Sequence, residues 1–166
     1  MRRTLEDTSL VEVLVSGMDV VDPVIRMRCA DALEKVTATV PGIAQRFSTR
    51  ILALLSHAQP KEVLWHLLQI APRISWSPQQ LPVVLAALAA AHKERSSIVK
   101  ACALQAEVEL LAQAPDRRRH VAGLVREACN SGAPAVRARA RKLFASLEGR
   151  RPSSRRRMRD TPRRDA

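Results

Sequence analysis

Residues 115–147 read PDRRRHVAGLVREACNSGAPAVRARARKLFASL and contain two segments of helical apolar periodicity separated by a short polar turn. A proline stands near the start of each segment, at Pro115 and at Pro134. Proline is favoured at the first position of a helix, because its missing N–H group would have no partner there. The intervening Asn-Ser-Gly at residues 130–132 is typical of a turn. The stretch therefore predicts two helices joined by a tight turn.

The same arrangement recurs upstream with a period of 37 residues. The expected starts of the first helices are Pro41, Pro78 and Pro115, and those of the second helices are Pro23, Pro60, Ser97 and Pro134. Stacked helix pairs bury a continuous core between neighbouring pairs, so a repeat of this length indicates an array. We expect one helical domain, residues 1–149, built from unit one (about 5–40), unit two (41–77), unit three (78–114) and unit four (115–149).

Apolar residues keep this period and predict which side of each helix is buried. In the first helices the expected core positions are Leu10, Leu14 and Gly17; Phe47, Ile51 and Leu54; Val84, Leu88 and Ala91; and Val121, Val125 and Ala128. In the second helices they are Ile25, Cys29, Ala32 and Val36; Val63, Leu67, Ile70 and Ile74; Val99, Ala103, Ala106 and Leu110; and Val136, Ala140, Leu143 and Leu147. Only unit two departs from the period, by one residue.

Local signals agree with these helix boundaries. Asp22 precedes Pro23 as a capping residue, and Ser77 with Gln80 has the spacing of a capping box. Pro72 is expected to end or kink the second helix of unit two. Because only 2% of the 166 residues are aromatic and none is Tyr, the composition also favours an all-α fold over a sheet.

Helix pairs of this length resemble the HEAT repeats of the armadillo-like α-solenoids. The similarity rests on the openings of the second helices, which are Asp22-Pro23-Val24-Ile25-Arg26, Val99-Lys100 and Ala133-Pro134-Ala135-Val136-Arg137. It covers residues 5–149 and implies an α-α superhelix whose second helices line a concave surface. The aspartate–arginine ladder of the family is incomplete, because Leu64 replaces the cation in unit two. The resemblance implies a non-enzymatic adaptor that binds a protein partner through this concave surface.

The chain lacks the common sequence signatures of catalytic, metal and cofactor sites. There is no H-E-x-x-H, G-x-x-x-x-G-K, G-x-G-x-x-G or G-x-S-x-G, and the three cysteines form no C-x-x-C. We therefore expect no enzyme, no cofactor and no bound metal. With neither a signal peptide nor an apolar run of about 20 residues, we expect a soluble cytoplasmic protein without a membrane span.

The net charge of +12 comes from the C-terminal end of the chain. The candidate cations for an anionic partner are Arg117, Arg118, Arg119, Arg137, Arg139, Arg141 and Lys142 in unit four, and Arg155, Arg156 and Arg157 in the tail. Residues 150–166 have too few apolar residues to fold alone and are expected to be disordered. This charge suggests an alternative function as a nucleic-acid-associated accessory protein. A polar cap on the last repeat, or Arg-rich coding, would give the same bias.

Trp65 is the candidate for a protein contact on the concave surface. It lies between core positions on the second helix of unit two, where an aromatic side chain packs into the core in most proteins. Tryptophan is also enriched where proteins bind one another, so a surface role is the alternative.

Overall fold

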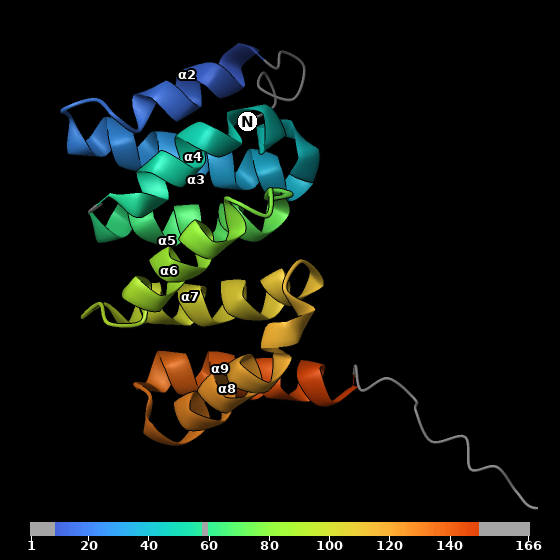
Figure 1. The fold of residues 1–166 in the computed structure, drawn as a ribbon. Coiled ribbons are helices and arrows are strands. Elements are labelled where there is room, and N and C mark those ends of the chain that lie inside the picture. Colours follow the sequence, from blue (N-terminus) through green and yellow to red (C-terminus); the bar gives the residue numbers. More distant parts are fainter. Residues whose placement is uncertain (1–8, 58–59, 150–166) are drawn as a thin grey trace, which may run out of the picture.

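A computed structural model describes residues 9–57 and 60–149, and every regular element in these ranges is helical (Figure 1). The α-helices are α2 (Ser9–Gly17), α3 (Pro23–Thr39), α4 (Ser48–Ser56), α5 (Lys61–Ile70), α6 (Leu81–Ala91), α7 (Ser97–Glu109), α8 (Arg118–Ser131) and α9 (Pro134–Gly149). Four 3-10 helices join them, η1 (Pro41–Phe47), η2 (Ala71–Arg73), η3 (Leu110–Ala112) and η4 (Pro115–Arg117). The all-α expectation is confirmed, whereas the tail with Arg155, Arg156 and Arg157 lies outside the described residues.

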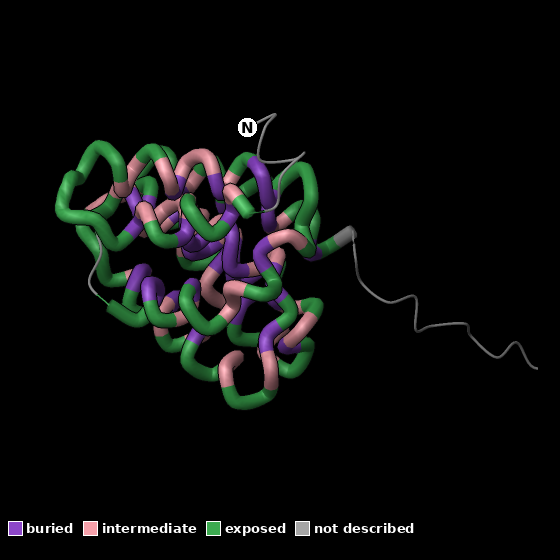
Figure 2. Tube along the Cα trace, turned by 90° about the horizontal axis from the view of Figure 1, so that it is seen from above, coloured by how far each residue is buried: buried purple, intermediate pink, exposed green. Residues whose placement is uncertain are grey.

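The helices pack as consecutive pairs. α3 packs against α5, α5 against α7 and α7 against α9, so the second helices of the four units form one layer (Figure 1). The first helices contact their own partners, α4 with α5, α6 with α7 and α8 with α9, and α4 also packs against α6. Viewed from above the stack, the buried residues lie on the inner sides of the helices (Figure 2).

Most of the predicted helix starts are confirmed by the structure. Asp22 accepts hydrogen bonds from the backbone N–H groups of Val24 and Ile25 and caps α3. Ser77 and Gln80 form the predicted capping box, with both hydrogen bonds at 3.2 Å. The helix after this box begins only at Leu81, not at Pro78, and Pro41 and Pro115 open 3-10 helices instead of α-helices.

Pro72 acts as expected, because α5 ends at Ile70 and a 3-10 turn follows. Two glutamines from neighbouring units hold the extended segment after this turn. The Gln45 side chain donates to the Ser75 carbonyl and accepts from its N–H, both at 2.8 Å. Gln113 donates to the Ile74 carbonyl at 2.8 Å and accepts from the Trp76 N–H at 2.9 Å. The linker between α5 and α6 is therefore tied to units two and three.

The predicted core positions are correct for the second helices of units two, three and four, and wrong for most of unit one. In α2 the buried residues are Val11, Val15 and Met18, whereas Leu10, Leu14 and Gly17 are half-buried. In α3 they are Ala30, Leu33, Val36 and Thr37, whereas Ile25 is 48% exposed and Cys29 and Ala32 are half-buried. Because apolar residues occupy several sides of these two helices, periodicity alone does not determine which side faces the core.

The one-residue irregularity therefore lies elsewhere in the array. Ala30, Leu67, Ala103 and Ala140 are fully buried and occupy equivalent places in the four second helices. They are separated by 37, 36 and 37 residues, so units one and two keep the period and the shortening falls between units two and three. It coincides with the early end of α5 before Pro72.

Candidate binding surfaces

Several cations expected to bind an anionic partner have structural contacts in unit four. Arg117 lies 3.6 Å from the carboxylate of Glu107 on α7, and its side chain is only 25% exposed. Arg118 donates to the Leu147 carbonyl near the end of α9. Arg137 donates to the carbonyl of Gly132, the residue that ends α8. These three arginines help to hold η4, α8 and α9 together.

The remaining cations of the predicted set are on the surface. Arg139 is exposed and donates to the side chain of Gln105 on α7 at 3.0 Å. Arg119, Arg141 and Lys142 are exposed as well, and within the part of the chain that the structure describes they have no hydrogen bond or ion pair to the protein. The predicted cluster therefore divides into structural and solvent-facing arginines.

A groove of about 610 Å³ lies between α8 and α9 at the C-terminal end of the stack. Its cations are Arg118, Arg119 and Arg126, its apolar floor includes Phe144 and Leu147, and Asp116 and Glu148 lie at its edge. Arg126 was not among the predicted site residues. The signal was present, because seven residues separate Arg126 from Arg119 and two helical turns bring them to the same side.

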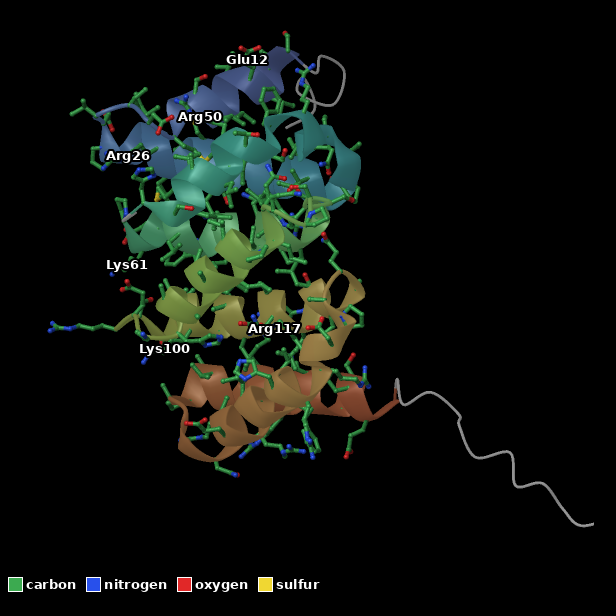
Figure 3. The ribbon with its side chains drawn as sticks, viewed as in Figure 1. Glu12, Arg26, Arg50, Lys61, Lys100 and Arg117 are labelled. Carbon is green, nitrogen blue, oxygen red and sulfur yellow. The ribbon has the colours of Figure 1, made fainter. Side chains whose placement is uncertain are left out.

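The contact between units three and four contains a buried carboxylate. The Glu107 side chain is 1% exposed, and Oε2 has no hydrogen-bond partner in the described residues. Burial raises the pKa of Glu107, and the charges of Arg117 and His120 oppose this rise. Arg117, labelled in Figure 3, lies between α7 and the α8–α9 pair. It therefore supplies the nearest compensating charge.

Trp65 is placed in the way that the packing interpretation predicts. The ring is half-buried and packs against the large hydrophobic core of units one to three. It meets the His66 ring edge to face, with centroids 5.7 Å apart. Burial lowers the pKa of His66, whose Nε2 lies 4.0 Å from the Asp31 carboxylate. The aromatic pair thus belongs to the packing between α3 and α5, with part of Trp65 still accessible.

An apolar surface that was not singled out in the sequence lies on α6. This helix reads LPVVLAALAAA and has no polar side chain, yet it buries only Val84, Leu88 and Ala91. Val83 is 42% exposed, and Pro82, Ala86, Ala89 and Ala90 are exposed too. A helix that is apolar on all sides is usually enclosed by protein or lipid, so this exposed side is unusual.

Grooves flank α6 on both sides. The first, of about 370 Å³, runs between α4, α5 and α6 and is lined by Leu55, Leu64 and Val83 among others. The second, of about 550 Å³, runs between α6 and η4 and is lined by Leu81, Pro82 and Leu85 among others. Ala86 lines both grooves. The outer side of α6 thus forms a ridge between two mainly apolar depressions, which we call the α6 ridge.

The chain matches no protein-family model, no curated protein and no solved structure. The resemblance to HEAT repeats therefore stays an expectation from the sequence. None of the helices within residues 9–57 and 60–149 is long and apolar enough to cross a membrane. In the same ranges, no three His, Cys, Asp or Glu side chains are grouped in a way that could hold a metal ion.

Proposed function

We propose that residues 1–149 form a HEAT-like α-solenoid that acts as a non-enzymatic cytoplasmic scaffold and binds an apolar segment of another protein on the α6 ridge. The observation that carries the proposal is that α6 has eleven apolar residues while its outer side is exposed. Contiguous apolar patches on soluble proteins commonly mark sites of protein interaction. A partner helix lying in either groove would cover this surface with its own apolar side.

This proposal moves the expected contact from the second helices to the first. The sequence pointed to Trp65 on the layer of second helices, but its ring packs largely against the core. The apolar grooves described above lie instead beside α6, in the layer of first helices.

The test compares two alanine positions that are both exposed on a helix. Ala86→Asp places a charge on the α6 ridge, and Ala138→Asp places the same charge on the exposed side of α9. Proteins that co-purify with the full chain from its native host are expected to be lost with Ala86→Asp and kept with Ala138→Asp. Trp65→Ala should leave them bound. Equal recovery with Ala86→Asp would contradict the proposal, provided that circular dichroism shows all variants folded.

A second candidate function is the binding of nucleic-acid phosphates by unit four. It is favoured by Arg119, Arg126, Arg141 and Lys142, which are exposed and have no hydrogen bond or ion pair within the described residues. Reversing Arg141 and Lys142 to Glu should weaken duplex binding and reduce its salt dependence by about two phosphate contacts. Arg137 is unsuitable for this test because its side chain holds the turn at Gly132. If the intact chain shows no binding to a duplex at about 50 mM salt, the candidate is excluded.

A further inference from the structure

The N-terminal end of the stack exposes an unusual number of large apolar side chains. Of the eight that are exposed in the described residues, five lie in the short stretch from α2 to the start of α3: Val13, Val20, Val21, Val24 and Ile25. Ile25 also belongs to the apolar pattern that predicts a buried position, yet it is 48% exposed. The sequence therefore places core-like residues on a surface that this chain leaves uncovered.

Ile25 projects away from unit two. Glu34, on the same helix, reaches toward unit two and forms an ion pair with Arg73 at 2.7 Å. Nine residues separate Ile25 from Glu34, and at about 100° per residue their side chains leave α3 on opposite sides. Ile25 thus faces the N-terminal end of the stack, where Figure 1 shows no further helix pair among the described residues.

This end is also acidic. Residues 9–25 contain Glu12, Asp19 and Asp22 and no Lys, Arg or His. Asp19 pairs with Arg50 on α4, and Asp22 caps α3. Glu12, labelled in Figure 3, extends from the outer side of α2 at this end.

The C-terminal end has the opposite charge and its own uncovered aromatic residue. Residues 118–149 contain seven Lys and Arg against two Glu. Phe144 is half-buried in the groove beside Arg119 and Arg126. It lies five residues after Arg139, which reaches α7, so its side chain leaves α9 about 140° away from that contact. Phe144 therefore faces away from unit three.

The repeat itself indicates what Phe144 would contact. Phe144 follows Glu107 by one period of 37 residues, and Glu107 is the residue of unit three that is buried against unit four. Phe144 thus occupies the position from which each second helix meets the next pair. At the other end, Ile25 occupies the side from which a preceding pair would be met.

We propose that copies of this chain associate end to end, with the acidic valine- and isoleucine-rich end of one copy on the arginine- and phenylalanine-lined end of the next. A head-to-tail contact of this kind joins two different surfaces, so it leaves a vacant surface at each end of the complex. Opposite charges orient the copies, and the apolar side chains at the centre lose water on contact. The proposal uses surfaces other than the α6 ridge and stands independently of the proposed function.

The test follows the mass of the full chain by sedimentation or light scattering up to about 1 mM protein. The mass is expected to rise above the 18.4 kDa of one chain with concentration and to fall back at high salt. Ile25→Arg should weaken association at least about tenfold, because it places a cation opposite the arginines. Ile98→Arg is the matched control, since Ile98 is 49% exposed on α7 and lies at neither end.

Complementation distinguishes an end-to-end contact from a symmetric one. Arg119→Glu with Arg126→Glu blocks the C-terminal end and leaves the N-terminal end intact, whereas Ile25→Arg does the reverse. Neither variant should associate alone, and a mixture of the two should regain association. A monomeric wild-type chain, equal effects of the two isoleucine substitutions, or a mixture that does not associate would overturn the proposal. Circular dichroism checks that each variant is folded.

Discussion

At the scale of single residues, Glu107 and Arg117 determine how unit four is held against unit three. Their charged groups lie 3.6 Å apart, and the glutamate side chain is 1% exposed. Removing one partner of a buried pair costs about 3–5 kcal/mol, because the other charge is left uncompensated, whereas removing both charges costs much less. The pair is therefore a source of specificity in the contact more than of net stability.

We predict that Arg117→Met lowers the free energy of unfolding at pH 7 by about 3 kcal/mol. Adding Glu107→Gln to this variant should restore most of the loss, because no buried charge remains. Urea denaturation of the two single variants and the double variant gives the coupling between the side chains. Equal stabilities of Arg117→Met and the double variant would contradict the assignment of Glu107 as its buried partner.

The same carboxylate makes stability depend on pH. Because burial raises the pKa of Glu107 above its ordinary 4.5, the folded protein holds this proton to higher pH than the unfolded chain does. The unfolding free energy contributed by this group therefore falls as pH rises from about 4.5 through the raised pKa. The difference in stability between the wild-type chain and Glu107→Gln should shift in favour of the variant over this range. A difference that does not change with pH would show that the carboxylate titrates normally.

At the scale of elements, the linker between α5 and α6 depends on side-chain to backbone hydrogen bonds. Gln113 forms two of them in a partly buried setting, and Gln45 forms two in an exposed setting. We predict that Gln113→Ala lowers the unfolding free energy by about 1–3 kcal/mol, because the backbone groups of Ile74 and Trp76 lose their partners. Gln45→Ala should cost less, since water replaces it at Ser75. Thermal unfolding measures both, and the reverse order would contradict this explanation.

How well the sequence predicts these elements depends on where they lie in the array. For the second helices of units two to four, the interior of the stack encloses a single apolar stripe, and Val63, Val99 and Val136 are buried as expected. In α3 the end of the stack leaves apolar residues uncovered, so periodicity selected Ile25 in place of Ala30. Interior packing is local and periodic, whereas the boundary of an array is not encoded in its period.

The candidate binding residues were predictable to a lesser degree. Charge density located the basic unit four, but it could not show that Arg117, Arg118 and Arg137 bind acceptors of the protein itself. Those partners come from residues that are 5 to 29 positions away in the chain, and only the fold brings them into contact. The exposure of α6 was equally hidden, because an apolar helix predicts burial from sequence alone.

At the scale of the whole molecule, the described residues contain two hydrophobic clusters. The larger spans units one to three, and the smaller consists of Leu104 and Val108 of α7 with residues of α8 and α9. Because α7 belongs to both clusters, it is the element that couples unit four to the rest of the stack. Separate clusters favour separate opening of the smaller part.

Native-state hydrogen exchange tests this organisation. Amides of α8 and α9 are expected to exchange through an opening of lower free energy than those of α3 and α5. Leu143→Ala, in the smaller cluster, should lower the protection of α8 and α9 by about 2–5 kcal/mol and leave α3 nearly unchanged. Loss of protection by the same amount in all helices would show instead that the chain opens as one unit.

The central functional claim concerns the α6 ridge, and site-specific photo-crosslinking tests it most directly. A photoreactive phenylalanine analogue replaces Val83 on α6 or, as the matched control, Ile98 on α7; these side chains are 42% and 49% exposed. In cells of the native host, the analogue at position 83 is predicted to form a discrete adduct with another protein, and Ala86→Asp should abolish that adduct. The absence of an adduct at position 83, or the same adduct at position 98, would contradict the claim that α6 is the binding surface.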